Sequence, residues 1–226
     1  MVKLRASYSR ELESSESSGA VFVVFVAVIL AAGLSTRFPG NKLLYSWWGK
    51  PVIKHTVENA LKSAVDSVVV VTGYMKREVE SALSDLNGKL HLVYNPDYNK
   101  GMSSSVKAGV RFVAENYEGE VEALFFTPGD CAWIPPVVYD IMIHHYREYK
   151  PLILVASYEG RRGHPILFDS KLVSELLNVE EETRGLKGVV EKYKWSLREL
   201  NLPFPGIVLD LDTYNDLNRV KHMIKK

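Results

Sequence analysis

The segment from Leu30 to Lys42 carries the residue types that a phosphate-binding loop needs. It follows an apolar run and combines small residues, glycines and hydroxyl side chains with two cations, Arg37 and Lys42. Small residues let backbone N–H groups approach phosphate oxygens, and the cations can neutralise a triphosphate and its developing charge. The GxxxxGK[ST] pattern of a Walker A loop is absent. An ordinary loop with basic surface side chains remains the alternative.

Asp130 is a candidate ligand for a metal ion. It follows an apolar strand and a Pro-Gly pair, so its side chain should emerge at the carboxyl edge of a sheet. A carboxylate there can hold Mg²⁺, a hard cation that prefers oxygen ligands and phosphates. A turn aspartate, which is common beside Pro and Gly, is the alternative.

Asp210 and Asp212 form a second acidic position. They lie two residues apart in a segment that we expect to be a strand, so both side chains should share one face. There they would repel each other unless a cation lies nearby. The alternative is that Asp212 or Thr213 caps the last helix.

Three further positions carry weaker signals. The segment from Gly101 to Ser105 precedes a helix whose N-terminal N–H groups can receive a phosphate or a base edge, although a simple serine cap at Ser103 or Ser104 is favoured. Gly163-His164-Pro165 places a histidine on an expected tight turn, with no triad partner nearby in the sequence. No base accompanies Cys131, so we expect no nucleophilic role for it.

Apolar runs alternate with amphipathic stretches along the chain, which predicts a mostly parallel sheet covered by helices, a Rossmann-like three-layer α/β sandwich. Ligands of such sheets bind at the carboxyl ends of the strands. The expected strands span residues 21–30, 67–72, 90–94, 123–127, 152–157, 165–168 and 206–211. The expected helices span residues 51–64, 76–83, 103–116, 135–149, 170–177, 185–193 and 213–224.

Length and composition narrow the class of protein. The chain has 226 residues, so one domain over residues 20–226 is the simplest expectation, preceded by a disordered polar tail over residues 1–19. With 28 basic and 27 acidic residues, nothing suggests bulk binding to nucleic acid. The single cysteine excludes a disulfide framework and fits a reducing cytoplasm.

The apolar run from Ala20 to Ala32 resembles a signal peptide, but it is short for a membrane span and acidic residues separate it from the basic ones. Cleavage near Ala31 would also cut the first loop. We therefore expect a buried strand, with no membrane partner.

Six segments, in order, resemble the molybdenum cofactor cytidylyltransferases, from about Val26 to about Lys221. Residues 30–42, LAAGLSTRFPGNK, are similar to that family's LAAGxSxRMGxxK signature, with Phe38 at the usual Met and Pro39 at the usual Gly. The other matches are VVVTGY (69–74), NPDYNKGMSSSVKAG (95–109), Gly129-Asp130, GHPILF (163–168) and LDLDTYNDL (209–217).

The resemblance implies the fold of the nucleotide-diphospho-sugar transferases and roles for the matching residues. Backbone groups of Leu30, Ala31, Ala32 and Gly33 should contact the base and ribose, and Thr72, Gly73 and Ser104 or Ser105 should line the base pocket. Arg37 and Lys42 should bind the triphosphate. Asp130, with help from Asp212, should hold Mg²⁺. Gly163, His164 and Pro165 should face the acceptor.

The implied reaction is transfer of CMP from CTP to the phosphate of molybdopterin, with release of pyrophosphate. A molybdoenzyme or its chaperone is the implied protein partner. The cytidylyl branch of the family reads LAAG where the guanylyl branch reads LAGG, so Ala32 favours CTP; guanylyl transfer from GTP is an alternative. The family's GDMP is here Gly129-Asp130-Cys131-Ala132, which leaves the acceptor open. The acceptor could also be a sugar phosphate or methylerythritol phosphate, or the protein could be a non-catalytic molybdopterin-binding module.

Overall fold

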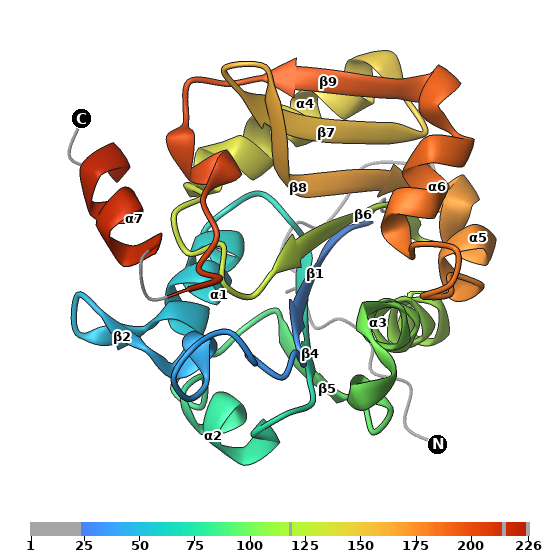
Figure 1. Ribbon diagram of the computed structural model, residues 1–226. Helices are drawn as coiled ribbons and strands as arrows, with labels where there is room; N and C mark the ends of the chain where they lie inside the picture. Colours follow the sequence, from blue (N-terminus) through green and yellow to red (C-terminus); the bar gives the residue numbers. More distant parts are fainter. Residues whose placement is uncertain (1–23, 118, 214–215, 225–226) are drawn as a thin grey trace, which may run out of the picture.

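The computed structural model describes residues 24–117, 119–213 and 216–224, so the expected tail lies outside the described residues. Seven strands form one sheet in the order β5-β4-β1-β6-β8-β7-β9 (Figure 1). Their bounds are β1 Val24–Ala31, β4 Ser67–Thr72, β5 Leu90–Tyr94, β6 Val121–Pro128, β7 Ile153–Tyr158, β8 Arg161–Asp169 and β9 Leu197–Asn201. A two-stranded hairpin, β2 Ser46–Trp47 and β3 Lys50–Pro51, lies apart from this sheet.

The sheet is mostly parallel. Strands β5, β4, β1 and β6 pair in parallel, and β7 pairs in parallel with β9. Strand β8 runs antiparallel to both of its neighbours, β6 and β7. The carboxyl ends of β1, β4, β5 and β6 therefore meet at one edge, where the first loop begins.

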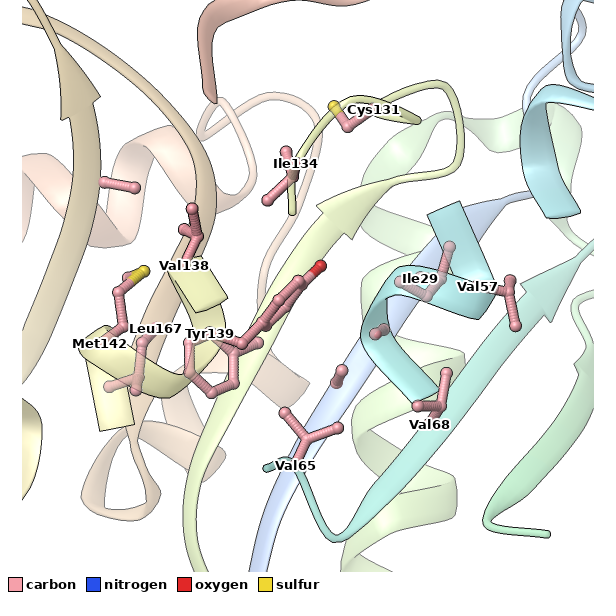
Figure 2. Close-up of a cluster of buried hydrophobic side chains, with 14 of the residues drawn as sticks. Ile29, Val57, Val65, Val68, Cys131, Ile134, Val138, Tyr139, Met142 and Leu167 are labelled. Carbon is pink, nitrogen blue, oxygen red and sulfur yellow. The ribbon is translucent and has the colours of Figure 1, made fainter. Parts of the chain in front are cut away.

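Helices cover both faces of the sheet, which confirms the three-layer prediction. Helices α1 (Val52–Leu61), α2 (Lys76–Ser81) and α4 (Pro136–Tyr149) pack into one hydrophobic cluster, part of which Figure 2 shows. Helices α3 (Met102–Asn116), α5 (Val173–Leu177) and α6 (Leu186–Lys192) pack into the cluster on the other face. The last helix, α7 (Asp216–Ile224), packs with the β2–β3 hairpin in a smaller third cluster.

The apolar run at the start of the described chain forms the central strand β1. Residues 25–29 are completely buried, with Phe25, Ala27 and Ile29 in one cluster and Val26 and Val28 in the other. A strand buried on both faces needs an uninterrupted apolar sequence, so the strand prediction for this run is confirmed for residues 24–31. No helix among the described residues is long and apolar enough to cross a membrane.

One predicted strand is wrong. Residues 206–211 form no strand; Pro205–Val208 is instead a 3₁₀ helix, η5. Pro205 has no backbone N–H to donate to a strand ladder, and a Cβ on Gly206 would lie 1.8 Å from the carbonyl oxygen of Trp133, so the backbone of η5 packs directly against the segment that follows β6. The last strand is β9, whose sequence LRELN has too few apolar residues to be recognised as a strand.

Candidate active site

The loop after β1 is held in shape by two polar side chains. Asn41 accepts a hydrogen bond from the backbone of Leu43 at 3.0 Å and so caps the short 3₁₀ helix η1 (Lys42–Leu44). The Ser35 hydroxyl lies 3.3 Å from the Asn41 amide oxygen and accepts from the backbone N–H of Lys42 at 3.4 Å. Gly33 is exposed, and a Cβ there would meet no atom within 4 Å. Hydrogen bonds therefore hold the end of the loop, whereas its start at Gly33 is exposed and leaves room for a ligand.

Lys42 brings two distant carboxylates together. Its Nζ lies 2.5 Å from Oδ2 of Asp130 and 3.1 Å from Oδ1 of Asp212. Arg37 joins the cluster through its Nη2, 2.9 Å from Oδ2 of Asp212. The Asp130 side chain is 5% exposed, whereas that of Arg37 is 69% exposed. The structure thus gathers Arg37, Lys42, Asp130 and Asp212 at the carboxyl edge of the sheet; we call these four residues the ion cluster.

The opposite charges in the ion cluster stabilise one another. Burial alone lowers the pKa of Lys42, but the charge and hydrogen bond of Asp130, and then those of Asp212, outweigh it and raise the pKa. Burial alone raises the pKa of Asp212, but Lys42 and then Arg37 outweigh it and lower the pKa. Both groups are therefore charged at neutral pH.

A third carboxylate lies near the ion cluster. Desolvation, followed by the negative charges of Asp130 and Asp212, raises the pKa of Asp210. Asp212 lies in a bend rather than a strand, so the shared face expected for Asp210 and Asp212 has no structural basis. Asp216 accepts from the backbone N–H groups of Asp212 and Thr213. The cap expected at Asp212 or Thr213 stays a prediction, because residues 214–215 at the start of α7 lie outside the described residues.

The donor set suits a hard divalent cation. Carboxylate oxygens of Asp130 and Asp212 already converge on one positive charge, the Lys42 ammonium. Mg²⁺ is usually bound by one or two carboxylates together with substrate phosphates rather than by a complete protein cage. No group of three or more His, Cys, Asp or Glu side chains in the described part of the chain is arranged to hold a metal by itself.

Ala32 and Gly73 lie side by side at the ends of β1 and β4. The backbone N–H of Tyr74 donates to the carbonyl of Ala32, and a Cβ on Gly73 would lie 2.7 Å from Cβ of Ala32 and 2.6 Å from Cβ of Tyr98. Only glycine fits at position 73. The Thr72 hydroxyl is buried and donates to Glu80, so any contact of Thr72 with a ligand must come from its backbone.

Asn95 holds the serines at the start of α3. Its Nδ2 donates to the hydroxyls of Ser104 and Ser105 at 2.8 and 3.0 Å. The Ser104 hydroxyl in turn donates to the backbone carbonyls of Asp97 and Gly101. These bonds fix the loop that follows β5 against α3.

A distant glutamate, rather than a serine, caps α3. Gly101 occupies the cap position, and the backbone N–H of Ser103 donates to Oε1 of Glu181 at 2.6 Å. The Glu181 carboxylate fills the space beside Gly101, since a Cβ there would lie 2.3 Å from that oxygen. The serine cap predicted from the sequence is therefore wrong, because a carboxylate 78 residues away satisfies this N–H group.

Gly163, His164 and Pro165 lie within strand β8 and not on the expected tight turn. The chain turns earlier, at Glu159 and Gly160, which have φ values of 49° and 73°. Burial lowers the pKa of His164 to about 4, so its imidazole is neutral at pH 7. The Nδ1 atom of this ring is buried and has no hydrogen-bond partner among the described residues.

Cys131 is buried directly beside the ion cluster. Burial, followed by the charge of Asp130, raises the pKa of its thiol well above the ordinary value. The thiolate is therefore scarce at neutral pH. This agrees with the expectation that Cys131 is no nucleophile.

The fold is that of the nucleotidyltransferases, and comparison with known proteins gives the family. Residues 27–197 match the model of the MobA-like NTP transferase domain. The chain therefore belongs to the MobA-like NTP transferase domain family, which confirms the resemblance and the enzyme class inferred from the sequence.

Individual relatives share this class. The molybdenum cofactor cytidylyltransferase of Escherichia coli (strain K12) is 27% identical, over 86% of this chain and 94% of that protein. A probable molybdenum cofactor guanylyltransferase of Thermococcus sibiricus is 28% identical, over 61% of this chain and 66% of that protein. A Mycobacterium tuberculosis protein solved in complex with manganese has the same fold, with a TM-score of 0.69 at 21% identity, over 88% of this chain and 98% of that one.

Sequence reasoning missed two polar residues beside the site. The sequence around Asn95 indicates only a turn, and Glu181 belongs to a charged segment with no motif. The position of Asn95 shortly before the serines is a weak indication that its side chain could reach them. Nothing in the sequence places Glu181 at α3, since that contact depends on the packing of α5 and α6.

Proposed function

We propose that this protein transfers CMP from CTP to the phosphate of a molybdopterin acceptor and releases pyrophosphate. The observation that carries the proposal is the ion cluster, in which Lys42 lies between the carboxylates of Asp130 and Asp212. Cations and carboxylates at the end of an open loop are what a triphosphate and its counter-ion require. The similarity to the E. coli cytidylyltransferase supports this acceptor.

Arg37 and Lys42 are proposed to bind the triphosphate. Arg37 is mostly exposed and lies on the loop, so it can turn from Asp212 to a phosphate without disturbing the core. Lys42 is more buried and holds its position between two carboxylates. Together they stabilise the negative charge that develops on the departing pyrophosphate.

Asp130 and Asp212 are proposed to hold Mg²⁺. The manganese bound by the M. tuberculosis protein supports a divalent ion in this fold. When bound, Mg²⁺ would neutralise phosphate charge beside the α-phosphorus. The residues of this chain then have the task of aligning the acceptor oxygen with that phosphorus, and no protein nucleophile is needed because the acceptor phosphate is already ionised.

Backbone groups of Leu30, Ala31, Ala32 and Gly33 are proposed to contact the base and ribose. Gly73 and the start of α3, at Ser104 and Ser105, complete this pocket. Ala32 lies against Gly73 at the ends of β1 and β4, and its methyl group, which the guanylyl branch lacks, is proposed to crowd a purine base. This favours CTP over GTP.

The acceptor is proposed to lie beside Gly163, His164 and Pro165, where β8 passes the ion cluster.

Two alternatives change one of the substrates but keep the same nucleotidyl transfer. Guanylyl transfer from GTP is supported by the relative from T. sibiricus. A sugar phosphate or methylerythritol phosphate would suit the same loop.

We also propose where the reaction takes place and which protein receives its product. Residues 20–226 act as one domain in the cytoplasm, and the product passes to a molybdoenzyme or its chaperone. A single buried cysteine is compatible with a reducing compartment.

A pyrophosphate-release assay tests the function. CTP, GTP, ATP and UTP are each supplied with Mg²⁺, with and without molybdopterin, and with a panel of sugar phosphates. We expect release only with CTP and molybdopterin together. Release of pyrophosphate with another acceptor would identify that acceptor as the substrate in place of molybdopterin. Binding of CTP without release of pyrophosphate under any condition would indicate a non-catalytic module.

A further inference from the structure

A polar cavity adjoins the ion cluster. It has a volume of about 190 Å³ and lies between the start of β8, residues 207–210 and helix α7. Its wall includes Cys131, which directly follows Asp130, and Asp210, which lies two residues before Asp212. A ligand in this cavity would therefore lie next to the proposed position of the α-phosphate.

Two close backbone contacts build the cavity wall. A Cβ on Gly163 would lie 1.9 Å from the carbonyl oxygen of Ile207, and Gly206 approaches Trp133 equally closely. Residues 206–210 are thus held between two other segments by glycines that admit no side chain. A wall fixed in this way can present its polar groups without rearrangement.

The charges on the cavity wall are unbalanced. Three arginines line it, and one of them, Arg162, is neutralised by Glu199 at 2.8 Å. Arg161 and Arg219 have no side-chain partner among the described residues. Asp210 is the one carboxylate among the lining residues, so an excess of positive charge remains. Exposed guanidinium groups that converge on a polar cavity are suited to bind a phosphate.

His164 adds unused hydrogen-bonding capacity to the same wall. Its Nδ1 is buried without a partner among the described residues, and its neutral ring adds no charge. Recognition of charge in the cavity therefore rests on the arginines.

We propose that this cavity receives the phosphate monoester of the acceptor and that Arg161 and Arg219 bind it. The inference rests on the proposed function, because the bound phosphate is the nucleophile. One of its oxygens forms a bond to the α-phosphorus of the nucleotide. The bond from that phosphorus to the bridging oxygen breaks, and pyrophosphate leaves with the electron pair. Arg161 and Arg219 are specificity residues for the acceptor and do not contact the nucleotide.

Titration of inorganic phosphate tests the cavity directly. Isothermal titration calorimetry compares the wild type with Arg161→Gln, Arg219→Gln and the double variant, with and without saturating CTP and Mg²⁺. Each substitution should weaken phosphate binding about tenfold, since each removes one charge-assisted hydrogen bond. Arg77→Gln is the matched control, because it removes an equally exposed charge on α2 and should leave the affinity unchanged.

Turnover supplies an independent readout. With molybdopterin as acceptor, Arg161→Gln and Arg219→Gln should raise the KM for the acceptor about tenfold and leave the KM for CTP unchanged. Unchanged phosphate affinity in the double variant would overturn the cavity proposal, even if the enzyme transfers CMP normally. Lost phosphate affinity in a protein that transfers no nucleotide would refute the proposed function and retain the anion site.

Discussion

Lys42 makes two ion pairs, and its position determines how the site responds to a single substitution. It contacts Asp130, which is nearly buried, and Asp212, which is one-third exposed. Removal of one carboxylate leaves the ammonium with the other partner, so the fold should tolerate the change. The substitution should then lower the rate of nucleotidyl transfer and leave the free energy of unfolding nearly unchanged.

Asp130→Asn should reduce pyrophosphate release by roughly 100-fold or more, as expected for loss of one preorganised electrostatic group. The amide preserves the size of the side chain, so the melting temperature should stay close to that of the wild type. Asp85→Asn serves as the control, because Asp85 forms an exposed ion pair with Lys54 on another part of the molecule. A wild-type rate for Asp130→Asn in excess Mg²⁺ would contradict the metal assignment.

Ala32→Gly should shift selectivity from CTP toward GTP. The alanine methyl group lies against Gly73, and its removal opens space for a purine. The ratio of kcat/KM for the two nucleotides measures the change, which we expect to be about tenfold for one methyl-sized group. An unchanged ratio would remove Ala32 from the account of base choice.

His164 should make stability depend on pH. Its pKa falls from 6.5 to about 4 on folding because the ring is buried, so the unfolded chain binds the proton first as the pH drops. The free energy of unfolding should therefore decrease between pH 6.5 and about 4, by at most about 3 kcal/mol, and level off below. Urea unfolding of His164→Gln should show a smaller decrease over this range; an identical profile would assign the dependence to other groups.

At the scale of elements, two glycines govern how η5 fits against its neighbours. Gly163 on β8 and Gly206 on η5 each approach a carbonyl oxygen more closely than any side chain would allow. This packing leads residues 207–212 to the ion cluster, in which Asp212 pairs with Arg37 and Lys42.

Gly163→Ala should destabilise the protein by about 2–3 kcal/mol, because the new methyl group would overlap the Ile207 carbonyl. Gly33→Ala is the matched control: the same methyl group there meets no atom within 4 Å, so stability should be unchanged. Urea unfolding measures both. Equal midpoints for the two variants would show that residues 206–210 can shift at little cost.

At the scale of the whole molecule, metal binding and folding should be separable. Lys42 and Arg37 already neutralise the charges of Asp130 and Asp212. The protein therefore needs no metal ion at this site to remain folded. EDTA should therefore abolish pyrophosphate release while shifting the melting temperature by no more than about 1 °C. Full activity in EDTA, unchanged by added metal, would argue against a divalent ion in the reaction.

The sequence by itself determined the architecture and the family. Strands buried on both faces must be apolar throughout, and the helices between them must be amphipathic, so β1, β4 and β6 and their connections could be predicted from local patterns. The motifs at 30–42 and at 129–130 could be predicted for the same reason, because each lies at the end of one of these strands. β9, whose apolar pattern is weak, could not.

Only the tertiary structure decided how the site is assembled. Lys42 and Asp212 are 170 residues apart, and their contact depends on how η5 packs against β8. The Glu181 cap of α3 and the cavity beside Arg161 and Arg219 arise in the same way, from segments with no shared sequence pattern. Local sequence controls which backbone conformation a segment adopts, whereas contacts between distant segments depend on the burial and close packing of the complete core.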